Sequence, residues 1–160
     1  MISRPRCRPW HNAVLKPKAL GLGHLRKLIS RMPFNQTLGF RVVKRHRDGV
    51  TLECPLRPDM LNGAGVLHGG VTATLADAAA GFALWNHFGG RRRGTTAEMK
   101  INYLRPVGSG KIVARSRLAR AGSTLCVSQV DVRDAAGRLA AVALVTYMLL
   151  PLPAAGDKKR

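Results

Sequence analysis

The sequence predicts an α+β domain in which an antiparallel sheet wraps around one long central helix. Two patterns carry this prediction. Apolar and small residues fill positions 68–87 with a helical repeat, and the later segments alternate between apolar and polar residues with a period of two. The length of 160 residues suits a single domain with a core of its own.

The composition is that of a globular protein, with 46% hydrophobic and 22% charged residues. The sequence has no apolar run of about 18 residues, so we expect no membrane-spanning helix. Cys7, Cys54 and Cys126 are scattered and form no CxxC pair. We therefore expect neither a zinc site nor a disulfide framework, and we predict a cytoplasmic location.

The charge balance is strongly basic, with 27 Lys and Arg against 8 Asp and Glu, a formal net charge of +19. Such a surface attracts polyanions: nucleic acid, an anionic membrane or a phosphorylated ligand. The alternative is that the arginines are simply spread over solvated faces. Only 5% of residues are aromatic and no DNA-binding motif is present, so nucleic-acid binding is the least favoured function for this chain.

The two ends of the chain differ from its middle. The first 47 residues carry 12 Lys or Arg and no acid, and the prolines before Ala19 exclude one continuous helix there. A transit peptide or an over-long start would look the same. We expect a basic, poorly ordered arm at 1–18, a folded domain at 19–150 and a disordered tail at 151–160.

The remaining elements follow from spacing and turn residues. Apolar residues at helical intervals predict a short helix from Leu22 to Met32, ending before Pro33. The alternation that begins at Gly39 and the turn pair Asp48-Gly49 predict a hairpin that returns over 50–54. A loop is expected at 59–66, and strands are expected at 95–104, 111–120, 124–133 and 139–149.

The long helix is predicted from His68 to His87, with Gly89-Gly90 ending it. One side is an apolar stripe and the opposite side is small, so we expect the helix to be buried on all sides. The stripe comprises Val71, Leu75, Ala78, Phe82 and Trp85, and the small side comprises Gly70, Ala73, Thr74, Asp77, Ala80 and Gly81.

Asp77 is the only charged residue between Val71 and Asn86. A buried carboxylate is unfavourable unless something pairs with it, and such groups are enriched at functional sites. Two other interpretations stay open. The carboxylate could be hydrogen-bonded to its neighbours for packing specificity, or it could face solvent through a gap.

The segment His68-Gly69-Gly70 opens the same helix. Free N–H groups and the helix dipole favour negative charge there, and glycine lets a ligand approach the backbone, so an oxyanion would be stabilised. The alternative is a glycine-rich helix start without a ligand, with His68 as its cap. Asn62, followed by glycine, equally suits a turn.

The stretch Asn62-Gly-Ala-Gly-Val-Leu-His68-Gly-Gly-Val-Thr-Ala-Thr-Leu-Ala-Asp77 resembles the hotdog-fold acyl-CoA thioesterases of the PaaI-like type. This group includes phenylacetyl-CoA thioesterase and mammalian thioesterase superfamily members. The segment from Thr95 to Pro106 resembles the family's next strand, and the resemblance spans roughly 38–148. It implies the hotdog fold and hydrolysis of acyl-CoA or aryl-CoA to free acid and CoA.

The resemblance also implies roles. Asp77 would be the general base on water or the nucleophile on the thioester, and the Gly69 N–H would be the oxyanion donor. Asn62 would position the carbonyl or the water, His68 would bond the carbonyl or hold the loop, and Thr96 would hold the water near the acid. Contacts to coenzyme A would come from Tyr103, Arg105, Pro106, Arg120, Gly122, Ser123 and Thr124. No metal and no cofactor is implied, because coenzyme A is part of the substrate.

A shared site is expected between two chains. Gly69 and Asp77 are eight residues apart on one helix, about 12 Å of axial rise, which is too far for both to reach one carbonyl. A two-fold partner could bring Asp77 of one chain to Gly69 of the other. The resemblance implies a homodimer of this kind, arranged as a dimer of dimers in a homotetramer, without a specific nucleic acid or membrane partner.

Two other functions remain as alternatives. One is a non-hydrolytic acyl-CoA binder or a hydratase on the same fold, although the Asp/His or His/Glu spacings of hotdog hydratases are not found. The other is a basic nucleic-acid-binding protein, which suits the charge alone.

Overall fold

The structure of the protein is a computed structural model that describes residues 19–151. The arm predicted at 1–18 and all of the predicted tail after Pro151 lie outside the described residues. Within 19–151, no helix is long and apolar enough to cross a membrane.

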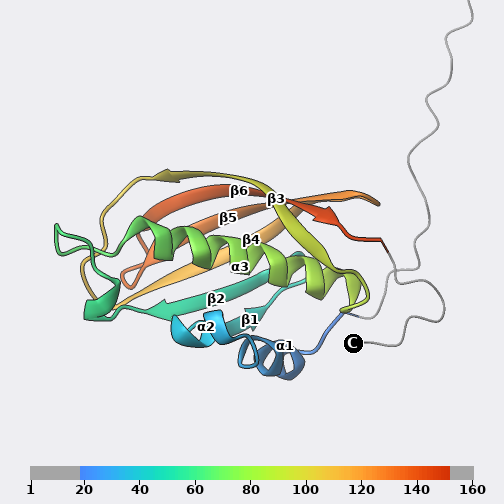
Figure 1. Ribbon diagram of the computed structural model, residues 1–160, viewed down its shortest axis with the longest axis horizontal. Helices are drawn as coiled ribbons and strands as arrows, with labels where there is room; N and C mark the ends of the chain where they lie inside the picture. Colours follow the sequence, from blue (N-terminus) through green and yellow to red (C-terminus); the bar gives the residue numbers. More distant parts are fainter. Residues whose placement is uncertain (1–18, 152–160) are drawn as a thin grey trace, which may run out of the picture.

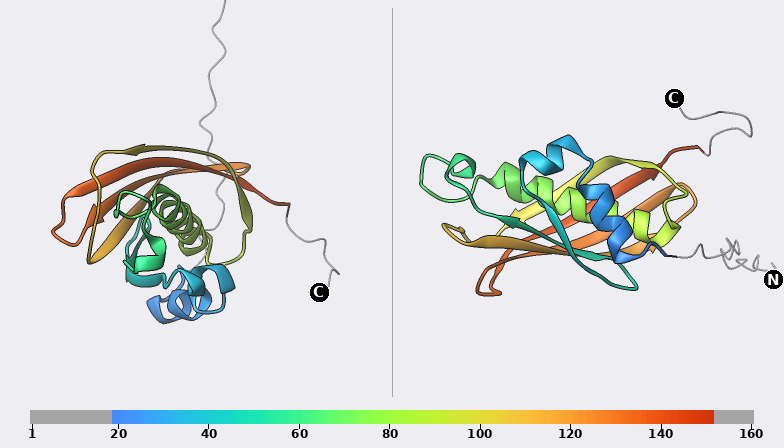
Figure 2. Two further views of the ribbon diagram at one scale, coloured as in Figure 1. Left: turned by 60° about the vertical axis from the view of Figure 1, so that its left-hand side comes forward. Right: turned by 90° about the horizontal axis from the view of Figure 1, so that it is seen from below.

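A six-stranded antiparallel sheet curves around the long helix α3 (Figures 1 and 2). The strand order is β1-β2-β4-β5-β6-β3, so β1 and β3 are the two edges. The predicted α+β class and hotdog architecture are confirmed. The elements are α1 (Leu22–Ile29), α2 (Pro33–Thr37), β1 (Arg41–Arg45), β2 (Val50–Pro55), the short 3-10 helix η1 (Pro58–Met60), α3 (Gly69–Phe88), β3 (Gly94–Tyr103), β4 (Lys111–Ala121), β5 (Leu125–Asp134) and β6 (Leu139–Leu149).

Helix α3 begins and ends close to the predicted residues. His68 caps its N-terminus, and Gly89 ends it in the left-handed conformation with φ of 60°, which glycine adopts without strain. Leu75, Ala79 and Phe82 are buried in the core beneath the sheet. Smaller helices α1 and α2 lie on the side of α3 away from β5 and β6 (Figure 2).

The expectation that α3 is buried on all sides is wrong for the single chain. Gly70 is exposed, and Thr74, Asp77 and Gly81 are only half-buried, whereas Ala80 is fully buried. The reason is geometric, because the sheet covers one side of the helix and leaves a stripe of its small residues open. Asp77 lies in this open stripe.

The short helix expected from Leu22 to Met32 ends earlier, at Ile29, and a second helix, α2, starts at Pro33. Proline suits the first turn of a helix, because its φ is preset and its missing N–H would have no partner there. The pattern around Phe34 and Asn35 is too short to reveal five helical residues in advance. The β1–β2 hairpin, predicted from Asp48-Gly49, is confirmed.

A bulge in β3 sets the geometry near the middle of α3. Thr96 pairs with Tyr147 and Glu98 pairs with Thr146, so Ala97 is an extra residue on β3. Side chains on a strand alternate between the two faces, and one extra residue reverses that alternation. Thr96 therefore lies on the same face of the sheet as Tyr147, toward the helix.

Candidate active site

Asp77 lies halfway along α3 and is half-buried. Its Oδ1 accepts a hydrogen bond from the Thr96 hydroxyl at 2.8 Å and another from the Tyr147 hydroxyl at 3.0 Å. Two neutral hydroxyl donors, and not a cation, thus hold the carboxylate in the described chain. The two bonds fix the position of the carboxylate, which stays within reach of a ligand.

A cavity of about 270 Å³ opens beside Asp77, between α2 and α3. Apart from the Asp77 carboxylate, its lining is uncharged and mostly apolar. It is formed by Met32, Phe34, Asn35, Thr74, Asp77, Ala78, Gly81, Phe82, Trp85, Gly94 and Tyr147. A single carboxylate in an apolar cavity is a typical arrangement for a site that binds an apolar group and performs acid–base or nucleophilic chemistry on it.

Tyr147 is a site residue that the sequence did not reveal. It lies on β6, and the tyrosine contacts both groups of core residues. Burial raises the pKa of the Tyr147 phenol above its ordinary value of 10.0, and the negative charge of Asp77 acts in the same direction. The phenol therefore stays protonated at neutral pH and donates. An inward aromatic residue on a strand looks like any core residue, so the sequence carried no signal for this role.

The N-terminus of α3 is arranged around His68. Its Nδ1 accepts from the Gly70 N–H at 2.9 Å, and its carbonyl accepts from the Val71 N–H at 3.0 Å. His68 is therefore a helix cap, as the simpler interpretation had it, and in the neutral ring the proton lies on the exposed Nε2. The Gly69 N–H has no acceptor among residues 19–151, so it is free to donate to a ligand oxygen.

Tyr103 lies over this helix start. Its hydroxyl donates to the Gly69 carbonyl at 3.0 Å, and a Cβ at position 69 would lie 3.2 Å from two ring carbons. A larger residue at 69 would therefore push the ring away. Tyr103, predicted to touch coenzyme A, is placed where it also fixes the first peptide of α3.

Asn62 holds the loop that precedes α3. Its Oδ1 accepts from the N–H groups of Ala64 at 2.9 Å and Val66 at 3.3 Å, so Asn62 has the turn role that its sequence context also suits. The amide oxygen is thus engaged. The side chain can still offer its NH2 group, a donor suited to a carbonyl oxygen.

The residues predicted to bind coenzyme A form two groups at different levels of the sheet. Tyr103 pairs with Ala141 and Leu125 pairs with Met148, seven residues apart on β6, which is about 23 Å along the strand. One group comprises Tyr103, Arg105 and Pro106, and the other comprises Arg120, Gly122, Ser123 and Thr124. One chain does not bring these groups together.

Several of these residues also have local structural contacts. Arg105 donates from Nη1 to the Leu139 carbonyl at 2.8 Å. A Cβ at Gly122 would lie 2.6 Å from the Leu125 carbonyl oxygen, so the β4–β5 turn requires glycine there. Arg120 is exposed and pairs with Val127, whose neighbours on β5 point into the core, so Arg120 lies on the outer face of the sheet.

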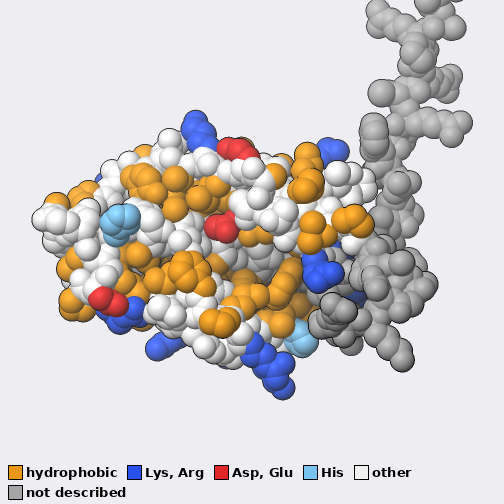
Figure 3. Space-filling view, viewed as in Figure 1, with side chains coloured by type: hydrophobic (Ala, Val, Ile, Leu, Met, Phe, Trp, Pro, Cys, Tyr) orange, Lys and Arg blue, Asp and Glu red, His pale blue; other side chains and the backbone are white. Residues whose placement is uncertain are grey.

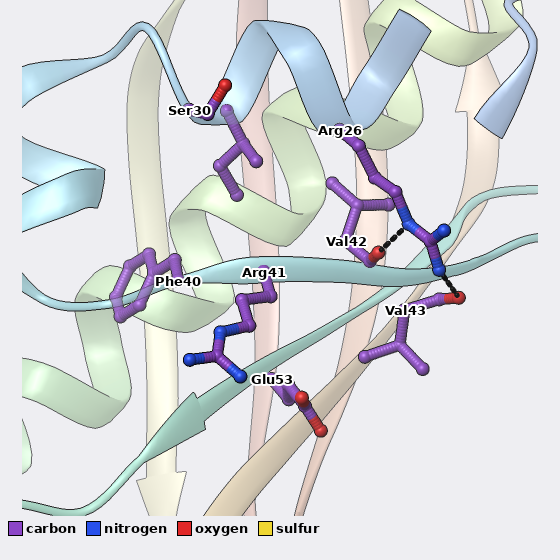
Figure 4. Close-up of a pocket in the computed structure, with 8 residues that line it drawn as sticks. Arg26, Ser30, Phe40, Arg41, Val42, Val43 and Glu53 are labelled. Atoms are coloured by element: carbon purple, nitrogen blue, oxygen red, sulfur yellow. Dashed lines mark hydrogen bonds between the residues drawn. The ribbon is translucent and has the colours of Figure 1, made fainter. Parts of the chain in front are cut away.

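A second and larger cavity, of about 340 Å³, lies between α1 and the β1–β2 edge (Figure 4). None of the predicted site residues lines it. Arg26 donates to the carbonyls of Val42 and Val43, and Glu53 forms an ion pair with Lys111 at 2.8 Å. In this larger cavity, Arg26 and Glu53 are already bonded to other groups of the protein. The smaller cavity beside Asp77 is therefore the better candidate for the substrate site.

No group of three or more His, Cys, Asp or Glu residues that could hold a metal ion is found within 19–151.

Comparison with known proteins shows which family this fold and sequence resemble. The sequence model of the thioesterase superfamily matches residues 64–141, a range that contains His68, Gly69, Asp77 and Thr96. The chain has the hotdog fold, and residues 64–141 resemble the thioesterase superfamily.

Individual relatives agree with this assignment. The medium/long-chain acyl-CoA thioesterase YigI of Escherichia coli is 29% identical over 136 residues, covering 76% of this chain and 88% of YigI. A thioesterase of Haemophilus influenzae superposes with a TM-score of 0.80 at 27% identity, covering 89% of this chain and 99% of its own. Thioesterase superfamily member 2 of zebrafish has a TM-score of 0.75 at 26% identity, covering 83% and 100%. These similarities support thioester hydrolysis as the activity.

Proposed function

We propose that the protein hydrolyses acyl-CoA thioesters to a free acid and coenzyme A, with Asp77 as its catalytic carboxylate. One observation carries the proposal: a carboxylate held by two hydroxyl donors forms part of the wall of an otherwise uncharged cavity. The YigI relative, named as an acyl-CoA thioesterase, supports the substrate class.

The chemistry needs one base or nucleophile and one oxyanion donor. As a base, Asp77 takes a proton from water, the hydroxide adds to the thioester carbon, and the C–S bond breaks to release the CoA thiolate. As a nucleophile, the carboxylate displaces the thiolate itself, and water then hydrolyses the anhydride. In both routes the Gly69 N–H binds the carbonyl oxygen as it becomes negative, with His68 and Asn62 as nearby donors.

The cavity beside Asp77 would hold the acyl group of the substrate. From Asp77 to Trp85 it follows eight residues of α3, about 12 Å, which suits an acyl chain of medium length. Phe82 and Trp85 line this cavity, whereas Phe88 and Met99 pack into the core. We therefore favour medium-chain acyl groups as the substrates.

The two-chain site follows from the same distances. Gly69 and Asp77 of one α3 are about 12 Å apart, so a complete site takes Gly69 from one chain and Asp77 from another. Edge strand β3 and the open stripe of α3 offer a surface for this partner. On the face that carries α3, hydrophobic side chains gather across the middle, with Lys and Arg mainly at its margin (Figure 3). If the partner's α3 ran antiparallel to this one, one group of predicted CoA contacts from each chain would also lie at the same site.

A panel of acyl-CoAs of increasing chain length, assayed for thiol release, tests the proposal. We expect turnover with a maximum at medium chain length, and a native mass of a dimer or a tetramer. Binding of acyl-CoA without thiol release would indicate a non-hydrolytic binder. Tight, sequence-selective DNA binding at physiological salt, without hydrolysis, would favour a nucleic-acid partner. The cytoplasmic location stays a proposal, in keeping with free Cys54 and Cys126.

A further inference from the structure

The two oxygens of the Asp77 carboxylate are in different environments. Oδ1 accepts from Thr96 Oγ1 at 2.8 Å and from Tyr147 Oη at 3.0 Å, whereas Oδ2 has no hydrogen-bond partner among residues 19–151. Both donors thus hold the same oxygen. Rotation of the carboxylate would break both bonds, so Oδ2 is the oxygen available to a water molecule or to a thioester carbon.

We propose that Tyr147 is a positioning residue for the reaction, fixing Asp77 so that Oδ2 is the reacting oxygen; this inference rests on the proposed function. Tyr147 Oη also lies 3.1 Å from the Asp77 backbone carbonyl. A phenol has one proton, and a carboxylate is the stronger acceptor, so the proton lies mainly toward Oδ1. Thr96 and Tyr147, from neighbouring strands β3 and β6, then act as a two-point clamp on one oxygen.

The helix is shaped to admit this phenol. Gly81 lies four residues after Asp77, on the same face of α3, one turn further along. A Cβ at position 81 would lie 2.8 Å from Tyr147 Oη and 3.3 Å from Cζ, closer than such contacts tolerate. Glycine is unfavourable inside a helix, and the room it leaves for the hydroxyl gives a physical reason for it here. Gly81 thus supports the proposal independently of the hydrogen bond.

The ring itself is anchored by packing. Tyr147 packs against both core groups, and a Cβ at Gly94 would lie 3.4 Å from its Cδ1. This packing therefore fixes the position of the Tyr147 hydroxyl beside Asp77. The other residues around the cavity are uncharged, so Tyr147 is the titratable side chain in contact with Asp77 in the described chain.

The test is Tyr147→Phe, which keeps the ring and removes the donor. We expect kcat to fall about tenfold with KM changed by less than about twofold, because the group acts on the chemical step. A purely structural role would not lower kcat while leaving KM nearly unchanged.

Two companion variants make the result specific. Gly81→Ala keeps the phenol but displaces it, and should also lower kcat with KM nearly unchanged. Tyr103→Phe removes a phenolic hydroxyl that contacts Gly69 and not Asp77, and should change KM more than kcat. Thermal melts establish that each variant is folded.

The outcomes separate this inference from the proposed function. If the wild-type protein releases no thiol, or if folded Asp77→Asn stays active, the proposed function fails. If wild type is active, Asp77→Asn is inactive, and Tyr147→Phe matches wild type in kcat, the positioning role of Tyr147 alone is wrong. Should Tyr147→Phe prove unfolded, Gly81→Ala with a wild-type kcat gives the same negative answer.

Discussion

Replacing Asp77 by Asn removes the reacting charge while keeping most of the local structure. The Asn side-chain oxygen can still accept from Thr96 and Tyr147 in the place of Oδ1. Two charge-assisted hydrogen bonds become neutral ones, at a cost of about 1 kcal/mol each, and relief of the carboxylate's desolvation offsets part of this. We expect a net loss of about 1 kcal/mol, a fall in Tm of about 3–4 °C.

The loss of activity should be far larger than the loss of stability. An amide is neither a base nor a nucleophile, and a positioned general base contributes about 10² to 10⁴ in rate. A thousandfold fall corresponds to about 4 kcal/mol of transition-state free energy. Release of the CoA thiol, followed with a chromogenic thiol reagent, measures kcat directly, and a thermal melt gives the Tm.

A matched control is Asp131→Asn, which removes the same charge from a carboxylate paired with Arg117 on the outer face of β5. This variant should keep nearly full activity. If folded Asp77→Asn hydrolysed acyl-CoA at a near-normal rate, Asp77 would not be the catalytic carboxylate, and both routes given for the reaction would be excluded.

Three further outcomes are expected. Inactive Asp77→Asn and Asn62→Ala chains, mixed so that subunits exchange freely, should regain about a quarter of wild-type activity, because half the dimers are mixed and each has one intact site. Arg120→Ala should raise KM about three- to tenfold with kcat nearly unchanged, because a phosphate contact is the same in the ground and transition states. In the folded protein at pH 8, the Cys54 and Cys126 thiols should resist iodoacetamide, because burial raises both thiol pKa values, that of Cys54 to about 11. The stability that neutral Cys54 contributes is present below pH 9.0 and is lost as the pH rises through about 11.

Each of these has its control. Native mass spectrometry must show the mixed dimers, and Asn62→Ala must be nearly inactive alone; mixed dimers without activity would exclude the shared site. Arg117→Ala removes the same charge on the same outer face, and an equal rise in KM there would mean a general charge effect. Labelling of Cys54 or Cys126 before unfolding in urea would contradict their burial.

Interactions between residues that are close in the sequence could be predicted from the sequence. The cap from His68 to the Gly70 N–H and the turn held by Asn62 span two to four residues, so the residue types and the spacing define them. The ends of α3 and the strand segments followed from periodicity and glycine in the same way. The position of Thr96 beside Asp77 came from the family resemblance, and periodicity alone does not give it.

The tertiary structure decided what surrounds Asp77. Tyr147 lies 70 residues away, and its hydroxyl reaches the carboxylate only because β6 pairs with β3 beneath the middle of α3. The bulge at Ala97 turns Thr96 toward the helix. The alternation of apolar and polar residues along the sequence does not show where such an extra residue lies. The open stripe on α3 depends on how far the sheet wraps around it. The sequence by itself determined the long helix, the strands and candidate residues such as Asp77, because those depend on local spacing, whereas long-range strand pairing brought the Thr96 and Tyr147 hydroxyl groups to the carboxylate.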